Sequence, residues 1–146
     1  MKTVPLDGVE YIGADTDLVA ALVASNSAQF SRPGRRFILA DVTKTDLPRV
    51  DVILCRDCFI HLPFFAIRAA LMNFRRSGAR YVLTTHYPGV ESQVDIEFGS
   101  FRPLNLELPP FAFPKPLKCI ADAPLGSTQP EGRCLALWRL LDLPLD

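Results

Sequence analysis

Reactive side chains gather in one short stretch of the sequence, Val50–Pro63, which reads VDVILCRDCFIHLP. An apolar run leads directly into Cys-Arg-Asp-Cys, and a histidine follows just before the proline. Four kinds of site use such residues: a metal clip, a redox pair, a cysteine nucleophile and the rim of a ligand pocket.

The first two alternatives are disfavoured by the rest of the sequence. A structural zinc site needs four ligands, usually in two close pairs. Cys119 and Cys134 are distant in sequence, so we expect no second pair and no metal site. A redox pair after a strand is disfavoured because the negative charge of Asp57, between the two thiols, opposes thiolate formation.

The other two alternatives concern the same turn. A nucleophilic cysteine needs a histidine beside its sulfur, and His61 is close in sequence. In the pocket-rim interpretation, which we favour, Cys55 is a small packing residue. Arg56 and Asp57 then provide polar contacts, or equally form a structural ion pair. His61 could serve there or cap the following helix.

The surrounding segments alternate between predicted strands and helices. Strands are predicted at Val9–Asp15, Arg35–Asp41, Val50–Asp57 and Ala79–Pro88, and helices at Thr16–Phe30 and Leu62–Gly78. Asp17 is expected to cap the first helix, Pro63 to lie in the first turn of the second and Gly78 to end it. This alternation predicts an α/β fold, with a mostly parallel, Rossmann-like sheet and helices on both faces.

The last third of the chain is different. Proline is frequent between Arg102 and Pro130, which predicts an irregular connection across one edge of the sheet. Leu117–Pro124 and Cys134–Leu143 are predicted to form an antiparallel hairpin that completes the sheet. Trp138 is expected in the core.

Length and composition favour an ordinary globular protein. The 146 residues fit a single domain, 1–146, and 16 basic residues balance 16 acidic ones. We therefore expect neither a nucleic-acid nor a membrane partner. The N-terminal residues lack the apolar core of a signal peptide, so a cytoplasmic location with reduced cysteines is expected.

Acidic residues end the first predicted strands. The first strand ends at Asp15 and the second at Asp41, and Cys55-Arg56-Asp57 ends the third. Ligands of parallel α/β sheets bind beyond the carboxyl ends of the strands, where an acid can accept hydrogen bonds from a ribose diol. Asp15 and Asp41 could equally cap the turns that follow them, and the two interpretations are about equally supported.

The segments YIGAD, FILAD, DVILCRDCFIHLP and SGARYVLTTHYP occur in an order and spacing that resemble class I S-adenosylmethionine-dependent methyltransferases. The similarity covers about Val9–Pro88 and extends to the final strands. RPLNLELPPFAFPKPL also resembles the late segment of a bacterial subgroup within that family. The resemblance implies a Rossmann-like fold, S-adenosylmethionine as cofactor and a small-molecule methyl acceptor.

The same resemblance implies roles for individual residues. Asp15 would hold the ribose hydroxyls, Asp41 would face the adenine amino group, and the backbone N–H of Val42 would lie near a ring nitrogen. Cys55 and Arg56 would line the floor beneath the methionine portion of the cofactor.

On the acceptor side, the resemblance places Asp57, His61 and His86 toward the substrate. His61 is the first candidate for a general base and Asp57 the second, while His86 is a substrate-binding candidate.

One departure from the family is large. Its members begin with a strand and a glycine-rich turn, and we find neither before Val9. That strand normally lies between the strands that end here in Asp15 and Asp57. Either these two strands pair directly, or a second copy or partner chain completes the sheet, or the chain is N-terminally truncated.

The departure keeps other functions open. A truncated, non-catalytic binding or assembly module would explain the missing strand. An enzyme that binds another adenine-containing ligand would retain the roles of Asp15 and Asp41 without methyl transfer.

Overall fold

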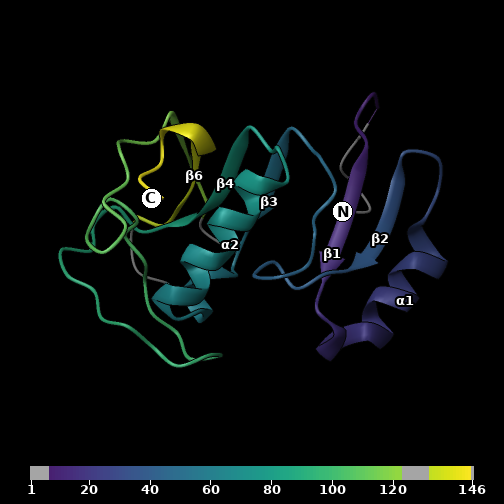
Figure 1. The fold of residues 1–146 in the computed structure, drawn as a ribbon, viewed down its shortest axis with the longest axis horizontal. Helices are drawn as coiled ribbons and strands as arrows, with labels where there is room; N and C mark the ends of the chain where they lie inside the picture. The colour runs from purple at the N-terminus through teal and green to yellow at the C-terminus, as the bar shows by residue number, and fades with distance from the viewer. Residues whose placement is uncertain (1–6, 123–131, 146) are drawn as a thin grey trace. The chain divides into compact units, whose positions relative to one another are not determined.

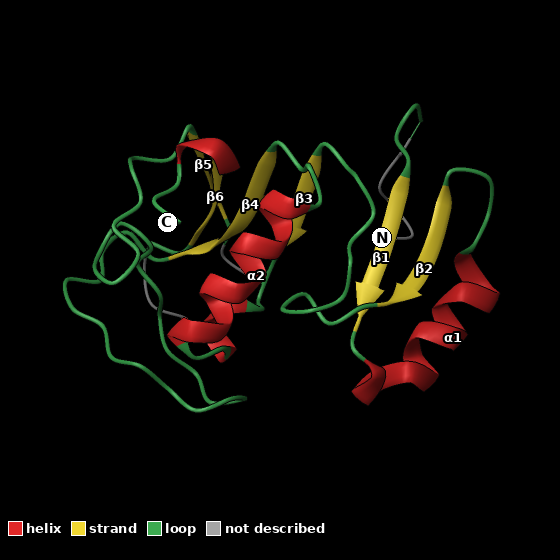
Figure 2. Cartoon of the chain, viewed as in Figure 1, coloured by secondary structure: helices red, strands yellow, loops and turns green. Residues whose placement is uncertain are grey.

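The computed structural model describes residues 7–122 and 132–145. The chain divides into two compact units, Met1–Thr45 and Asp46–Asp146, and each is described by itself. The fold is mixed α/β, with helices and both parallel and antiparallel strand pairs (Figures 1 and 2). The predicted α/β class is confirmed at this level. Among the described residues, no helix has the length and apolarity needed to cross a bilayer.

The first unit is a parallel strand pair with a crossover helix. Strand β1 (Tyr11–Asp15) pairs with β2 (Arg35–Leu39), and the register runs from Tyr11 opposite Arg35 to Asp15 opposite Leu39. The connection contains a 3-10 turn, η1 (Asp17–Val19), followed by α1 (Ala20–Phe30), as predicted. Because the strands are parallel, Asp15 and the residues after Leu39 lie at one edge of this sheet.

The start of this helix differs from the prediction for Asp17. Asp17 lies inside the first turn of η1, and neither Thr16 nor Val19, at the N-cap positions of η1 and α1, makes a side-chain cap hydrogen bond. The carboxylate of the preceding Asp15 accepts the backbone N–H of Thr16 at 2.8 Å. Asp15, and not Asp17, therefore satisfies a backbone donor at this end.

The second unit holds a four-stranded mixed sheet in the order β3-β4-β6-β5. Its elements are β3 (Val52–Cys55), η2 (Phe59–His61), α2 (Phe64–Arg76), β4 (Tyr81–His86), β5 (Lys118–Ala121), β6 (Cys134–Arg139) and η3 (Leu140–Asp142). β3 and β4 are parallel, whereas β6 is antiparallel to both β4 and β5. The predicted C-terminal hairpin is confirmed; the end of its first predicted strand, at 123–124, lies outside the described residues.

Helix α2 carries the core of the second unit on one face. The buried positions Ile67, Leu71 and Phe74 recur at helical spacing and are 0 % exposed, while Phe65 and Met72 face solvent. Phe74 stacks on Phe59 of η2, with ring centroids 6.1 Å apart. As predicted, Trp138 is buried.

The ends of α2 are set by three residues. Pro63 occupies the N-cap position, one residue before the first turn in which it was predicted. The N–H of Phe64 donates to Oδ1 of Asp95, 2.7 Å away, so a distant carboxylate caps the helix. Gly78, with φ of +81°, follows the C-terminus as predicted.

The predicted irregular connection is part of the core. The N–H of Tyr87 donates to the carbonyl of Leu104 at 2.9 Å, and Leu104 and Leu106 are 0 % exposed. Trp138 Nε1 donates to the carbonyl of Pro114 at 2.8 Å. The segment therefore contributes buried leucines to the core and accepts the hydrogen bond of the Trp138 indole.

The strands form two sheets, not one mostly parallel sheet. Among the residues the structure describes, β1 has β2 as its ladder partner and β3 has β4, and no ladder joins β1 to β3. The direct pairing of these two strands, one of the arrangements considered from the sequence, does not occur among the described strands.

Candidate functional site

At the carboxyl ends of the strands of the first sheet, the backbones of Asp15 and Asp41 lie near each other. The N–H of Ala40 donates to the carbonyl of Asp15 at 2.8 Å, so Asp41 follows directly after a residue bonded to Asp15. The side chain of Asp15 is exposed, and Oδ1 accepts the Thr16 N–H. Among residues 7–122 and 132–145, its other carboxylate oxygen has no hydrogen-bond partner.

The carboxylate of Asp41 closes a local turn. Oδ1 accepts the N–H of Thr43 at 2.9 Å and its hydroxyl at 2.6 Å, and Nζ of Lys44 lies 3.1 Å from Oδ2. These bonds, the one from the Thr43 hydroxyl foremost, lower the pKa of Asp41. The arrangement is that of a turn cap, the alternative weighed for this acid.

In the second unit, the stretch Cys55–Cys58 forms the turn that leaves β3. Cys55 is buried and Cys58 half-buried. Asp57 has a φ of +54°, a conformation that costs a non-glycine residue energy and persists only where contacts hold it. The N–H of Asp57 donates to Oγ1 of Thr85 on β4, 2.9 Å away.

Two arginines and two aspartates lock this turn to the end of the sheet. Nη2 of Arg133 lies 2.6 Å from Asp57 and 2.8 Å from Asp122, and Nε of Arg56 lies 3.0 Å from Asp122. Nη1 of Arg56 also lies 3.4 Å from Asp57. The structural ion pair considered for Arg56 and Asp57 is therefore present.

The charges in this network compensate one another. Burial opposes ionisation of Asp122, but hydrogen bonds from Arg56 and Arg133 outweigh it and lower its pKa. Sequence reasoning missed Asp122 and Arg133, because their partners in the turn, Arg56 for Asp122 and Asp57 for Arg133, are far away in the sequence and no motif marks them.

His61, at the end of η2, has one ring nitrogen fixed by the backbone. Its Nδ1 lies 2.9 Å from the carbonyl oxygen of Ser100, which can only accept, so Nδ1 carries the proton. In the neutral ring, Nε2 then holds the lone pair, as a general base requires. Phe101 lies beside the ring, with centroids 6.0 Å apart.

His86 at the end of β4 is held on both sides of its ring. It is 0 % exposed; Nδ1 accepts the N–H of Leu106, and Nε2 lies 3.3 Å from the carboxylate of Glu107. Burial lowers the pKa of His86, and Glu107 partly offsets this. Both nitrogens are therefore engaged within the chain, as in a structural histidine; its predicted substrate-binding role stays a prediction.

The four cysteines form two pairs, and the two members of each pair lie close together: Cys55 with Cys58, and Cys119 with Cys134. Cys119 on β5 and Cys134 on β6 lie within hydrogen-bonding reach, which corrects the expectation that they would form no second pair. Burial, and then contact with Cys119, raise the pKa of Cys134 to about 12. The two pairs are far from each other, because β4 and β6 lie between β3 and β5. At ordinary strand spacing, the axes of β3 and β5 are about 14 Å apart. Among residues 7–122 and 132–145, no group of three metal-ligating side chains converges.

Arg102 is a third residue that sequence reasoning missed. Its guanidinium lies over the ring of Phe64, 4.5 Å from the centroid, and the residue is 4 % exposed. Burial lowers the pKa of Arg102, while the charge of Asp95 opposes the shift. This stacking ties the connection after β4 to the start of α2.

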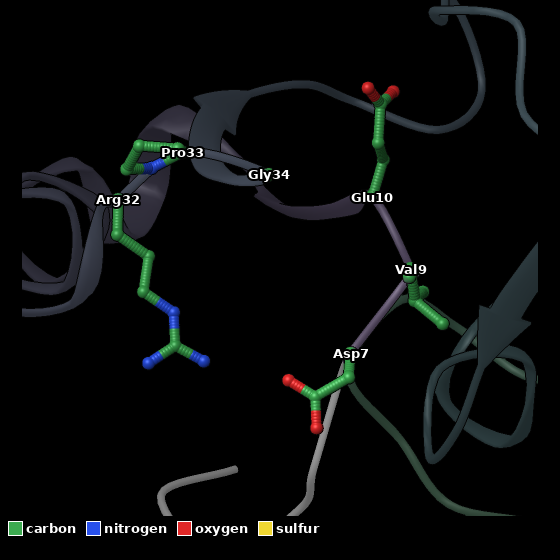
Figure 3. A pocket seen from close by; sticks show the side chains of 7 residues that line it. Asp7, Val9, Glu10, Arg32, Pro33 and Gly34 are labelled. Carbon is green, nitrogen blue, oxygen red and sulfur yellow. The ribbon is translucent and has the colours of Figure 1, made fainter.

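The first unit also has an open groove at the opposite edge of its sheet. About 600 Å³ is enclosed by residues that precede β1 and β2: Asp7, Gly8, Val9, Glu10, Arg32, Pro33 and Gly34. In Figure 3 the side chains of Asp7 and Arg32 extend toward the same space, whereas Glu10 points away. This groove lies at the amino ends of the strands, away from Asp15 and Asp41.

The predicted site residues are thus distributed over both units. Asp15, Asp41 and Val42 belong to the first unit, and Cys55, Arg56, Asp57, His61 and His86 to the second. Within the second unit, the turn after β3 and the end of β4 are joined by the bond from Asp57 to Thr85. No protein-family model and no curated protein matches the chain.

Proposed function

We propose that the chain is a Rossmann-like, S-adenosylmethionine-dependent methyltransferase that acts on a small-molecule acceptor. The observation that carries the proposal is the strand arrangement. Two parallel pairs, β1-β2 in the first unit and β3-β4 in the second, follow one another along the chain, and an antiparallel hairpin of β5 and β6 comes after them. This order of strands along the chain supports the family that the sequence resembles.

The residues of the first unit differ in their fit to the cofactor. Asp15 offers an exposed carboxylate at the end of a parallel strand, which suits a ribose diol. Asp41 is engaged by Thr43 and Lys44, so an adenine amino group would compete with those bonds. For Val42, the proposal retains the role that the resemblance implies: its backbone N–H would lie near a ring nitrogen of the adenine.

The resemblance assigns residues of the second unit to the methionine portion of the cofactor. Cys55 is small and buried at the end of β3, as a wall beneath the methionine portion requires. Arg56 is held by Asp122, which makes it a fixed rim residue. When bound, the cofactor supplies an electrophilic methyl group, and the protein contributes mainly proximity and orientation.

His61 is the stronger of the two base candidates. Its Nδ1 proton is directed to the carbonyl of Ser100, so Nε2 is the atom that would accept a proton from an acceptor hydroxyl or amine. The carboxylate of Asp57 is bound by Arg133, and protonating it would weaken that salt bridge.

A calorimetric titration tests the cofactor proposal. Wild-type protein, Asp15→Asn and Asp17→Asn would be titrated with S-adenosylmethionine and its demethylated product, and folding checked by circular dichroism. We expect micromolar binding, a loss of about 10- to 100-fold for Asp15→Asn from weakened charge-assisted hydrogen bonds, and little change for Asp17→Asn. Equal affinities for the two variants would remove Asp15 from the site.

A non-catalytic assembly module is the second candidate, and one observation favours it. β3 has a single ladder partner among the described strands, and its apolar residues Val52 and Leu54 are 48 % and 55 % exposed. An open edge with exposed apolar side chains invites a further strand. Sedimentation equilibrium would detect a second copy, and a folded monomer that binds no cofactor product would contradict both candidates.

The expected cytoplasmic location and the absence of a nucleic-acid partner accompany the proposal as predictions. The balance of 16 basic and 16 acidic residues supports the second of them.

A further inference from the structure

The C-x-x-C turn after β3 brings two thiols together. The side chains of Cys55 and Cys58 are within hydrogen-bonding reach, and both are reduced. Arg56 and Asp57 occupy the two central positions of the turn. We propose that Cys55 and Cys58 are a reversible dithiol–disulfide site that exchanges with a small-molecule disulfide.

Backbone geometry supports closure of this bond. The four residues of a β-turn place the first and last Cα atoms within about 7 Å, and disulfides span Cα distances of about 4.4–6.8 Å. The left-handed φ of Asp57, +54°, bends the chain so that Cys58 returns toward Cys55. The turn is therefore already folded in a shape that a disulfide can close.

The negative charge of Asp57, which from the sequence was expected to oppose thiolate formation, is compensated by neighbouring arginines. Its carboxylate lies 2.6 Å from Arg133 and 3.4 Å from Arg56, so its negative charge is compensated where it stands. A compensated carboxylate opposes formation of a neighbouring thiolate much less than an isolated one.

The exposure of the two thiols fixes the order of events. Cys58 is half-buried and can be reached from solvent, whereas Cys55 is 5 % exposed. The contact with Cys58 and burial raise the pKa of Cys55, so its proton leaves reluctantly. Cys58 is thus the attacking thiol and Cys55 the resolving one.

Each step balances without a further reagent. The thiolate of Cys58 attacks one sulfur of the small disulfide, breaks its S–S bond and releases one small thiolate, which takes up a proton. The thiolate of Cys55 then attacks the Cys58 sulfur of the mixed disulfide, forms the protein disulfide and releases the second small thiol. The protein loses two protons and two electrons, and the small disulfide gains them.

The second thiol pair is an internal comparison. Cys119 lies opposite Ala136, and Cys134 opposite Ala121, so the two cysteines are diagonal neighbours across β5 and β6. Diagonal neighbours have Cα atoms about 7–8 Å apart, at or beyond the limit for a disulfide. The turn pair should therefore close and the strand pair should not.

The bridge would enclose the residues that anchor the ion-pair network. Arg56 and Asp57 lie between the two cysteines and contact Asp122 and Arg133. Closing the ring restricts both side chains, so the oxidation state of the turn is coupled to the rim of the second unit. This inference is independent of whether the chain binds S-adenosylmethionine.

Tryptic mapping after oxidation tests the proposal. The protein would be incubated with oxidised glutathione, quenched in acid, alkylated and digested. Trypsin cuts after Arg56, so a Cys55–Cys58 bond joins peptides 50–56 and 57–68, and reduction separates them. We expect this linked peptide pair in the wild-type protein, together with the loss of two alkylatable thiols. The same linked pair should form in the double variant Cys119→Ser/Cys134→Ser.

Two variants complete the test. Cys55→Ser should stop at a glutathione mixed disulfide on Cys58, while Cys58→Ser should leave Cys55 unmodified. A persistent mixed disulfide in wild-type protein, a Cys119–Cys134 bond in place of the turn bond, or full alkylation of all four cysteines would overturn the proposal. Wild-type mapping decides the matter even if a serine variant fails to fold.

Discussion

Arg133 and Asp57 form a salt bridge of 2.6 Å, from Nη2 to Oδ1, across a separation of 76 residues. The side chain of Arg133 is 4 % exposed and that of Asp57 is 37 % exposed, so a buried cation pairs with a partly exposed carboxylate at the end of the sheet. It fastens the start of β6 to the turn after β3. Asp57 and the turn from Cys55 to Cys58 are therefore positioned by a residue that is distant in sequence.

Replacing Arg133 by methionine should destabilise the second unit. Asp57 and Asp122 would lose a shared cation; because Asp57 is 37 % exposed and Asp122 keeps Arg56, we expect a cost of about 1–2 kcal/mol, between the costs of losing a surface and a buried ion pair. Urea unfolding measures the loss. Arg139→Met is the matched control, since its side chain is 52 % exposed and 3.9 Å from Asp142. An equal loss in the two variants would show that the buried network contributes little.

Stability should fall in acid because carboxylates are paired. The folded-state pKa of Asp122 lies below the ordinary value of 3.8, so its contribution is present above that value and is lost as pH falls through the folded-state pKa. Asp122→Asn should lower stability at neutral pH and flatten this part of the curve. Unfolding measured from pH 6 to pH 2 tests it, and parallel curves for the two proteins would refute it.

Local patterns predicted the elements well. Helix α2 follows from its apolar spacing, and the last two strands from apolar runs after a proline-rich segment. The division into two sheets did not follow, because strand pairing depends on neighbours that are distant in sequence. The contact of Cys119 with Cys134 was missed for the same reason: the register of β5 and β6 creates it.

The candidate site was predicted in part. The ion pairing of Arg56 and Asp57 was an explicit alternative, and the sequence placed both at the end of a strand. Their partners, Asp122 for Arg56 and Arg133 for Asp57, carry no motif and emerge only from the fold. The role of Asp41 as a turn cap needs the positions of Thr43 and Lys44, which the sequence leaves undetermined.

Removing the cap of α2 should destabilise the second unit modestly. Asp95 accepts the N–H groups of Phe64 and Ile96, and loss of an N-cap costs about 1 kcal/mol. Asp95→Ala would be compared with Glu97→Ala, an exposed acid on the same segment, by chemical unfolding. If Glu97→Ala has the larger effect, the capping role of Asp95 is wrong.

The buried face of α2 should tolerate truncation poorly. Leu71 is 0 % exposed, and replacing it by alanine should cost about 2–5 kcal/mol through lost burial and a residual cavity. Met72, its neighbour, is 57 % exposed, and Met72→Ala should cost less than about 0.5 kcal/mol. Thermal unfolding of the two variants should separate them clearly, and similar melting temperatures would contradict the assigned core.

Amide chemical-shift mapping with S-adenosylhomocysteine tests the central claim most directly. The protein would be labelled with nitrogen-15 and titrated with the demethylated cofactor product. The account predicts saturable shifts at the carboxyl ends of the strands, at Asp15, Val42 and the turn from Cys55 to Asp57. Unchanged spectra, or shifts confined to the groove between Asp7 and Arg32, would contradict it.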